Sequence, residues 1–241
     1  MDAQLKLPET QEIPLVCRSC EARHGGICST LTTQQLAELN KHSQRRAVEA
    51  GTELIGQGEL VTSYSNVLKG VVKLQKIMAD GRQQIVGLQF APDFMGRPFL
   101  GESLMTAEAA TDTELCVLPR RLLERMIGES SDLGAKLHRQ ALLELDEARD
   151  WMLTLGRKSA REKVASLLVL IATHTEPEDI RDCAFDLPLS RADIADFLGL
   201  TIETVSRQMT KLRKDGIIHI ENNRHVIVPD FERLSVAAGG D

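Results

Sequence analysis

The C-terminal quarter of the chain constrains the fold most, because it carries the start and stop signals of two short helices in succession. Ser190 and Asp193 form a capping-box pattern that begins the first helix, and Gly199 is suited to end it in the left-handed conformation. Thr201 can cap the second helix, so a tight glycine-bearing turn joins the pair as in a helix-turn-helix. The turn 221–224, between the runs IIHI and HVIV, then predicts a β-hairpin wing.

The second helix carries the side chains expected to read DNA. Glu203, Ser206 and Arg207 are spaced i, i+3 and i+4, so they project together from the N-terminal half of this helix. Arginine can bond to guanine, glutamate can accept from a cytosine amino group, and serine can do either. Residues 201–215 include four basic and two acidic side chains, although the whole chain has a net charge of −6. Further DNA contacts are expected from Thr201, Thr210, Lys211 and Arg213, and a buried stripe from Ile202, Val205, Met209 and Leu212.

The composition is that of a globular protein, with 42% apolar and 27% charged residues. No stretch approaches the ~18 consecutive apolar residues of a transmembrane helix, and the polar N-terminus lacks an apolar export segment. We therefore expect a cytoplasmic protein with reduced cysteines and no membrane partner. The six histidines are dispersed and no nucleophile–base pair stands out, so we predict no catalytic residues and no enzyme.

Three of the five cysteines are clustered in the sequence, namely Cys17, Cys20 and Cys28. Gly25 and Gly26 allow the intervening loop to fold tightly enough for the three sulfurs to converge on one metal centre. A four-thiolate site needs one more ligand, for which Cys116 and Cys183 are the candidates, while His24 could complete a zinc site. The spacing alone leaves both structural zinc and an iron–sulfur cluster open.

Short alternating apolar runs broken by glycine, from about residue 45 to residue 118, predict a small antiparallel barrel or roll. The turn 79–82 contains Asp-Gly between two such runs, which is a strong hairpin pattern. An irregular tail is expected over residues 1–16, a cysteine-bearing loop over 17–28, and a short helix from Thr32 to about His42.

A long helical region follows Pro119, with apolar residues every three or four positions, as suits pairing with another helix. This seam consists of Leu133, Leu137, Ala141, Leu145, Ala148, Met152 and Leu155. We expect it to form a homodimer, the alternative being that it packs against the chain's own roll. Glu144, Asp146, Glu147 and Asp150 crowd the same stretch and would repel across a two-fold axis, which suggests a weak, tunable dimer.

The predicted fold class is therefore α+β, with an N-terminal antiparallel β-roll sensor domain, a long dimerisation helix and a C-terminal winged helix-turn-helix. The expected divisions are the tail and cysteine loop at 1–29, the roll at 30–119, the dimerisation helix at 120–155 and the DNA-binding domain at 156–241.

The cysteine pattern and the stretch LGLTIETVSR resemble the cyclic-AMP receptor protein superfamily, specifically its oxygen-sensing fumarate and nitrate reduction (FNR-type) regulators. The resemblance runs from Cys17 to the wing, and the x7 spacing before Cys28 is similar to the alphaproteobacterial branch. It implies that Glu203, Ser206 and Arg207 read an inverted repeat resembling TTGAT-N4-ATCAA, with one half for each subunit. In the family the fourth ligand lies in the roll just before the dimer helix, which implies Cys116, in TELCVLPR, rather than Cys183.

The resemblance further implies an oxygen-labile [4Fe–4S] cluster, one per subunit, that stabilises the dimer when intact. It also implies a contact with RNA polymerase at Ala79, Asp80, Gly81 and Arg82. Three other interpretations were weighed: a cyclic-nucleotide-responsive regulator, a zinc-stabilised regulator and an iron–sulfur electron carrier. The first is disfavoured because the segment 94–97 and the run EAATDTEL lack the Gly-Glu pair and the arginine that hold a cyclic phosphate. The third is disfavoured because an electron carrier needs no recognition helix.

Overall fold

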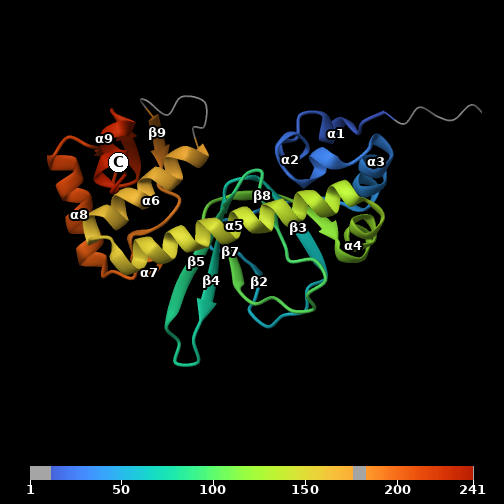
Figure 1. The fold of residues 1–241 in the computed structure, drawn as a ribbon, viewed down its shortest axis with the longest axis horizontal. Coiled ribbons are helices and arrows are strands. Elements are labelled where there is room, and N and C mark those ends of the chain that lie inside the picture. Colours follow the sequence, from blue (N-terminus) through green and yellow to red (C-terminus); the bar gives the residue numbers. More distant parts are fainter. Residues whose placement is uncertain (1–11, 176–182, 241) are drawn as a thin grey trace, which may run out of the picture.

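The computed structural model describes residues 12–175 and 183–240. Figure 1 shows a central β-roll crossed by the long helix α5 (Ser131–Arg157), with the N-terminal helices at one end and the C-terminal domain at the other. Within these described ranges no helix is long and apolar enough to cross a membrane.

Two four-stranded antiparallel sheets make up the roll. The first has the strand order β1 (Gln44–Val48), β8 (Thr113–Pro119), β3 (Ser63–Lys69) and β6 (Phe94–Met95). The second has the order β2 (Glu53–Ile55), β7 (Thr106–Ala109), β4 (Val71–Ile77) and β5 (Gln83–Phe90). Gly70, with φ of 86°, carries the chain from β3 into the other sheet, and a Cβ there would lie 2.5 Å from the Asp112 carbonyl oxygen. A small apolar cluster that includes Val67, Val72 and Leu115 fills the space between the sheets.

The hairpin of β4 and β5 is confirmed, with pairs from Val71 opposite Phe90 to Ile77 opposite Gln83. Gly81 at its tip takes a φ of 84°. The tip residues 79–82 are all exposed, and the hairpin projects away from the body of the molecule in Figure 1. The location of this turn is therefore compatible with a protein contact.

The N-terminal segment corrects one expectation, because short helices replace most of the predicted loop 17–28 and the last two residues of the predicted tail. They are α1 (Leu15–Arg18), α2 (Glu21–His24) and the 3-10 helix η1 (Ile27–Thr30). The turns close locally, since Cys17 N donates to Pro14 O at 2.8 Å, and buried Ala22 and Ile27 fasten them to the roll. The part of the predicted tail before residue 12 lies outside the described residues. The helix expected after Thr32 is confirmed as α3 (Thr33–His42), with a capping box.

The long helical region after Pro119 is two helices rather than one, namely α4 (Arg120–Glu129) and α5. They are separated by Ser130, whose extended backbone ends α4 and whose hydroxyl accepts from Leu133 N at 3.3 Å to begin α5. Leu123, Met126 and Leu133 are completely buried against the outer face of the first sheet, together with Leu118. The break allows α4 to cover the sheet while α5 continues across the roll.

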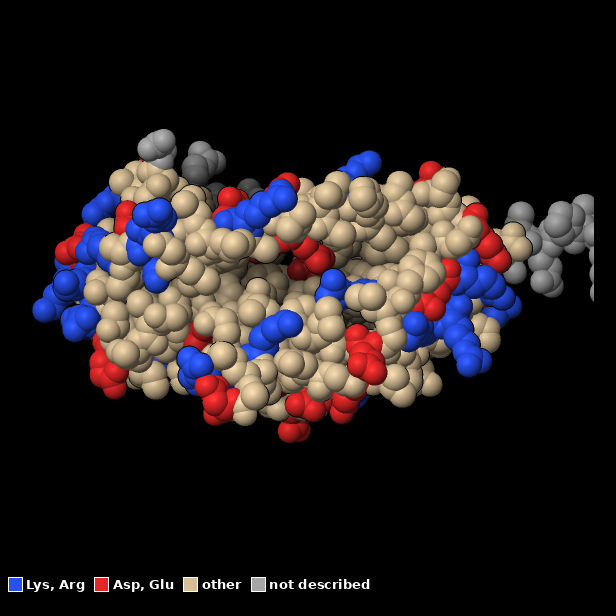
Figure 2. All heavy atoms as spheres, turned by 60° about the horizontal axis from the view of Figure 1, so that its bottom comes forward, with Lys and Arg blue, Asp and Glu red and all other residues tan. Residues whose placement is uncertain are grey.

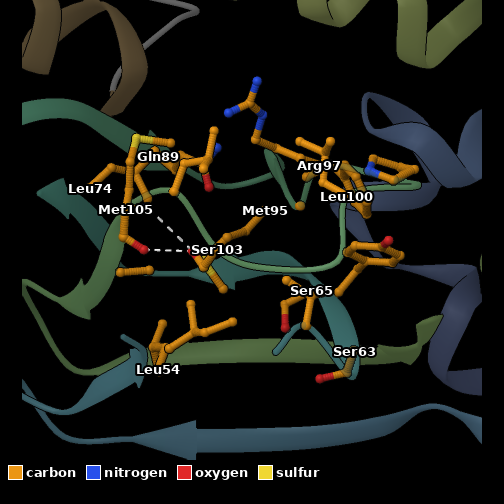
Figure 3. A pocket seen from close by; sticks show the side chains of 18 of the residues that line it. Leu54, Ser63, Ser65, Leu74, Gln89, Met95, Arg97, Leu100, Ser103 and Met105 are labelled. Carbon is orange, nitrogen blue, oxygen red and sulfur yellow. Dashed lines mark hydrogen bonds between the residues drawn. The ribbon is translucent and has the colours of Figure 1, made fainter. Parts of the chain in front are cut away.

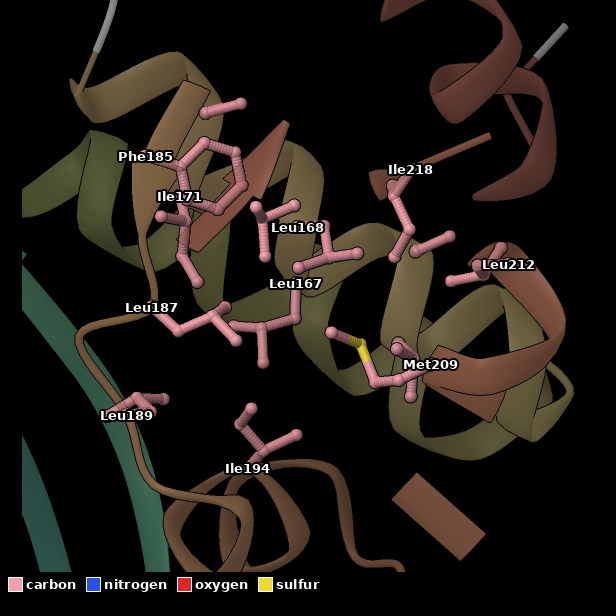
Figure 4. Close-up of a cluster of buried hydrophobic side chains, with 14 of the residues drawn as sticks. Leu167, Leu168, Ile171, Phe185, Leu187, Leu189, Ile194, Met209, Leu212 and Ile218 are labelled. Atoms are coloured by element: carbon pink, nitrogen blue, oxygen red, sulfur yellow. The ribbon is translucent and has the colours of Figure 1, made fainter. Parts of the chain in front are cut away.

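The C-terminal domain is a winged helix-turn-helix, as predicted. Its elements are α6 (Ala160–Thr175), β9 (Cys183–Asp186), α7 (Arg191–Leu198), α8 (Ile202–Lys214), β10 (His219–Glu221), β11 (His225–Val228) and α9 (Phe231–Ala237). The wing strands β10 and β11 pair as expected, and β9 adds a third strand that was not anticipated. Figure 4 shows the core, in which Leu167 and Leu168 of α6 lie between Ile171, beside Phe185 of β9, and the α8 residues Met209 and Leu212.

Candidate DNA interface and cysteine site

The start of each helix in the helix-turn-helix is fixed by side-chain caps. Ser190 Oγ accepts from Asp193 N at 3.1 Å, and Asp193 Oδ2 accepts in return from Ser190 N at 3.0 Å. Gly199 ends α7 in the left-handed conformation, with φ of 61°. Thr201 Oγ1 accepts from Thr204 N at 3.2 Å, so the oxygen of this predicted DNA contact also caps α8. These are the local interactions that the sequence predicted for the two helices.

The buried face of α8 is mostly as expected, with Val205, Met209 and Leu212 at 2% exposure or less. Ile202 is a correction, because 48% of it is exposed. It is the first residue of α8, and side chains on a helix lean toward the N-terminus, so Ile202 extends beyond the core that the following turns cover. Gln208 is buried, although its polar side chain gave no indication of this.

Glu203, Ser206 and Arg207 lie together on the exposed face of α8. Hydrogen bonds from its own backbone N–H and from the Thr201 side chain lower the pKa of Glu203, so this carboxylate is an acceptor at neutral pH. Among the described residues, the guanidinium of Arg207 has a single 3.4 Å contact, with Thr204 Oγ1, which leaves most of its donors available. Thr210 Oγ1 donates to Ser206 O at 2.9 Å. Lys211, Arg213 and Lys214 are exposed at the end of α8, and Figure 2 shows basic side chains gathered at this end of the molecule.

The helix-turn-helix is fastened to the roll by contacts that the sequence did not reveal. Lys73 Nζ on β4 lies 2.7 Å from Asp193 Oδ1 on α7 and 3.0 Å from Glu108 Oε1 on β7. Gln84 Nε2 on β5 donates to the carbonyl oxygen of Phe197 on α7 at 2.9 Å. Asp193 therefore serves both the capping box and the contact between the two domains.

The four predicted ligands come from two parts of the chain. Cys17 is in α1, Cys20 is the N-cap of α2, Cys28 is in η1 and Cys116 is in β8. Burial and, to a smaller extent, the charges of Cys116, Cys20 and Cys17 raise the pKa of Cys28 to about 12. Burial also raises the pKa values of Cys17 and Cys116, with Cys20 contributing to both. The four thiols thus lie within electrostatic range of one another.

Cys183 lies apart from these four thiols, in the core of the C-terminal domain, where it is 2% exposed. Among residues 12–175 and 183–240, no group of three or more His, Cys, Asp and Glu side chains has the arrangement to hold a metal ion. The cysteines are therefore neighbours without forming a closed metal cage.

Two side chains that the sequence analysis missed flank Cys116 in the first sheet. Arg45 on β1 and Asn66 on β3 are its register partners on the two sides. Arg45 Nη2 donates to Val16 O at 2.8 Å, and its charge offsets part of the burial-driven rise in the pKa values of Cys17 and Cys116. Asn66 Nδ2 donates to Cys28 Sγ at 3.6 Å. Asn66 is buried, although its polar side chain gave no indication of this in the sequence.

The cysteine segment packs closely on the rest of the molecule. A Cβ at Gly26 would lie 2.9 Å from Pro92 O and 2.9 Å from Ala22 O, so only glycine fits there. Lys136 Nζ, on α5, donates to Gly25 O at 3.0 Å. The segment therefore contacts both the turn after β5 and the first part of α5.

The apolar seam of α5 divides into two parts. Leu133 is buried in the chain's own core and Leu137 packs against that core, as the alternative interpretation expected. Residues 141–150 are all exposed, and the large apolar side chains exposed along this half of the helix are Leu142, Leu143, Leu145, Met152 and Leu153. Three of these, Leu142, Leu143 and Leu153, were not in the predicted seam. Ala141 and Ala148 are exposed as well, whereas Leu155 is half-buried.

A cavity of about 720 Å³ lies inside the roll, beneath α5. Figure 3 shows side chains from both sheets around it, including Leu54, Ser65 and Met105. Arg97, from the loop after β6, and Glu144, from α5, line its rim. The roll is thus hollow enough to admit a small molecule.

Comparison with known proteins assigns each half of the chain to a domain family. A model of the cyclic nucleotide-binding domain matches residues 45–130, and a model of the Crp-like helix-turn-helix domain matches residues 162–236. A probable transcriptional activator from Rhizobium leguminosarum is 66% identical over 92% of this chain and 92% of its own length. The transcriptional activator protein FnrL of Cereibacter sphaeroides is 42% identical over 95% of this chain and 96% of its own length.

The solved structure of FixK2 from Bradyrhizobium japonicum has the same fold, with a TM-score of 0.75 and 32% identity over 81% of this chain and 96% of that one. None of these relatives is named as an enzyme, in agreement with the prediction that the chain has no catalytic role. The β-roll, the long helix and the winged helix-turn-helix, together with these similarities, show that the chain belongs to the Crp/FNR family of transcription regulators.

Proposed function

We propose that the protein is a cytoplasmic, oxygen-responsive transcription activator that binds DNA as a homodimer when a [4Fe–4S] cluster is held by Cys17, Cys20, Cys28 and Cys116. When bound, the cluster supplies an oxygen-labile centre that links the N-terminal segment to β8. The names of the relatives support the activator role, and the 42% identity to FnrL covers the cysteine segment as well as the helix-turn-helix.

The observation that supports the proposal is that Cys17, Cys20, Cys28 and Cys116, from two distant parts of the chain, lie within electrostatic range of one another, whereas Cys183 lies in the core of the C-terminal domain. Burial, together with the charges of neighbouring thiols, raises the pKa values of Cys17, Cys28 and Cys116, so thiolates form here unfavourably unless a cation compensates their charge. Four thiolates also suit a single zinc ion, and metal analysis of the protein purified without oxygen distinguishes the two.

The proposed coupling to DNA runs through the chain's own contacts. Lys136 of α5 holds the cysteine segment through Gly25 O, and the exposed apolar half of α5 is suited to pair with a second copy of this helix. On that half, partial desolvation of the carboxylates raises the pKa values of Glu144 and Glu147, and the charge of Asp93 raises them further. Carboxylates at this interface weaken the dimer, so a modest coupling free energy between the cysteine site and α5 is sufficient to switch it.

Protein purified without oxygen should be brown, and its visible absorbance should bleach in air. Cys116→Ser should abolish the colour, whereas Cys183→Ser should retain it. A colourless anaerobic preparation that contains zinc would refute the cluster, and a coloured Cys116→Ser variant would refute Cys116 as a ligand.

In the proposed function, Glu203, Ser206 and Arg207 read the bases of a TTGAT-N4-ATCAA-like inverted repeat. The exposed turn 79–82 is the proposed contact for RNA polymerase. Arg207→Ala should weaken binding to this repeat by about 1–3 kcal/mol for each half-site, as expected when a bidentate contact to guanine is lost. Lys211→Ala should instead weaken binding to all sequences alike. Fluorescence anisotropy with the repeat and with a scrambled duplex distinguishes the two effects. Equal losses on both duplexes for Arg207→Ala would contradict base reading.

The cavity in the roll favours one second candidate, a regulator that responds to a cyclic nucleotide. Its volume of about 720 Å³ is sufficient for a nucleotide, and this part of the chain matches the cyclic nucleotide-binding domain. Isothermal calorimetry with cyclic AMP tests this candidate directly. Micromolar binding that also tightens the complex with DNA would support it over oxygen control.

A further inference from the structure

We propose that Asn66 is a positioning residue for the cysteine site, whose side-chain N–H group holds the sulfur of Cys28 in the orientation required for cluster binding. This inference rests on the proposed function, because it concerns the same four cysteines. It adds a residue that is not itself a ligand.

Asn66 is a buried residue with a defined hydrogen-bond partner, and it is not a polar group on the surface. Asn66 is 0% exposed, in the middle of β3, and lies directly opposite Cys116 of β8. Its Nδ2 donates to Cys28 Sγ at 3.6 Å across the packing between β3 and the N-terminal segment. One side chain therefore touches the sulfur of a ligand from the N-terminal segment and neighbours the strand residue that supplies the fourth thiol.

The side-chain oxygen of Asn66 indicates that this residue does more than stabilise the fold. Asn66 Oδ1 is buried and has no hydrogen-bond partner among the described residues. Burying an unpaired acceptor in an apolar environment destabilises a fold, so an apolar residue of the same size would suit this position better if packing alone mattered. Its register partner on β6, Phe94, and its contact Cys28 both belong to a cluster of buried apolar residues. A buried polar group that lowers the stability of the fold, as this side-chain oxygen does, is typical of a functional site.

The chemistry of the contact suits a metal-bound thiolate. A neutral thiol sulfur is a weak acceptor, whereas a thiolate accepts a stronger, charge-assisted hydrogen bond. Hydrogen bonds to ligand sulfurs are one of the means by which a protein sets the properties of an iron–sulfur cluster. Groups that bond to metal ligands from outside typically contribute a factor of 10–100 in metal affinity. Asn66 is thus placed to favour the ligand form of Cys28.

The test replaces Asn66 by leucine, which has a similar volume and no polar atoms. Wild type and Asn66→Leu are prepared without oxygen, and the loss of brown colour to a ferrous-iron chelator is followed by absorbance. The matched control is Gln75→Leu, since Gln75 is a buried amide of the other sheet that bonds to Glu108 at 3.1 Å. We expect Asn66→Leu to lose its cluster about tenfold faster than wild type, and Gln75→Leu to match wild type.

Thermal unfolding of the metal-free proteins gives the second readout. Asn66→Leu should unfold at the same temperature as wild type or at a higher one, because an unpaired buried acceptor has been removed. A second variant, Asn66→Asp, keeps the shape of the side chain, removes the donor and adds a like charge, so it should lose the cluster at least as fast as the leucine variant.

Each result decides a different claim. A wild-type protein that holds no cluster refutes the proposed function and this inference together. A loaded wild type whose rate of loss is unchanged in Asn66→Leu or in Asn66→Asp overturns the inference alone. Equally fast loss in Gln75→Leu also overturns it, because the effect would then belong to any buried amide of the roll.

Discussion

Replacing Lys73 by methionine should loosen the helix-turn-helix from the roll while each part stays folded. The Lys73 ammonium group lies 2.7 Å from a carboxylate oxygen of Asp193 and 3.0 Å from one of Glu108, and its side chain is 12% exposed. Methionine fills similar space without charge. The substitution therefore leaves two carboxylates, 20% and 27% exposed, facing each other without a cation.

The size of the effect follows from this partial burial. Removing one partner of a fully buried ion pair costs about 3–5 kcal/mol, whereas an exposed pair contributes about 0–1 kcal/mol. The exposures of Lys73, Asp193 and Glu108 are intermediate, so we expect a loss of about 2 kcal/mol in the free energy that docks α7 onto the roll.

The pH dependence of this loss can be derived from the two pKa shifts. Burial lowers the pKa of Lys73, but hydrogen bonds to Asp193 and Glu108 leave it raised above 10.5, so its contribution is present below that pH and is lost as pH rises through the folded pKa. Burial raises the pKa of Asp193, but hydrogen bonds from Lys73 and Ser190 leave it lowered below 3.8, so its contribution is lost only as pH falls through the folded pKa. The difference between wild type and variant should be constant between pH 3.8 and pH 10.5.

The fluorescence of the single tryptophan can report undocking of α7 from the roll. Trp151 on α5 is the single tryptophan, and its ring lies edge-on to that of Phe197 of α7 at 4.6 Å. Urea unfolding followed by tryptophan fluorescence should show Lys73→Met undocking at lower urea, while Lys76→Met, an exposed lysine of the same strand, should match wild type. A double-mutant cycle with Asp193→Asn should give a coupling energy of about 1 kcal/mol. A coupling below about 0.3 kcal/mol would refute the reasoning.

Three further outcomes are expected. Ser190→Ala removes the oxygen that accepts from Asp193 N and should lower the stability of the C-terminal domain by about 1 kcal/mol in thermal unfolding; no change would mean that the cap is dispensable. Leu168→Ala, in the core at 1% exposure, should cost about 2–5 kcal/mol, against about 0.5 kcal/mol or less for the exposed control Val86→Ala in the same denaturation assay. Met152→Glu, at a position 72% exposed on α5, should give a monomer in sedimentation with unchanged unfolding, and a stable dimer would exclude this face as the interface.

The sequence was most informative where local interactions decide the structure. The capping box at Ser190, the left-handed Gly199 and the wing turn at Asn222 and Asn223 all depend on residues within a few positions of one another, and all were predicted. The hairpin of β4 and β5 belongs to the same class, because its turn lies between its own strands.

The sequence was least informative where distant segments meet. The partners of Cys116, namely Arg45 and Asn66, belong to different strands and become neighbours only through the sheet order. Lys73 and Asp193 are 120 positions apart, and no pattern in either segment indicates the contact. The short helices around Cys17 and Cys20 were also missed, since four-residue helices have too few residues for a periodic pattern.

The close packing of Gly26 has a consequence for how the molecule is made. Residues 17–28 leave the ribosome before the turn at Pro92 and before β8, yet a Cβ at Gly26 would touch Pro92 O, and Cys116 lies in β8. The segment therefore cannot complete its docking until roughly the first half of the chain has been synthesised, a delay of some seconds at about 5–20 residues per second. During that interval its three thiols are exposed to whatever reacts with them, so the order of synthesis, as well as the finished fold, determines how long this part of the chain is unprotected.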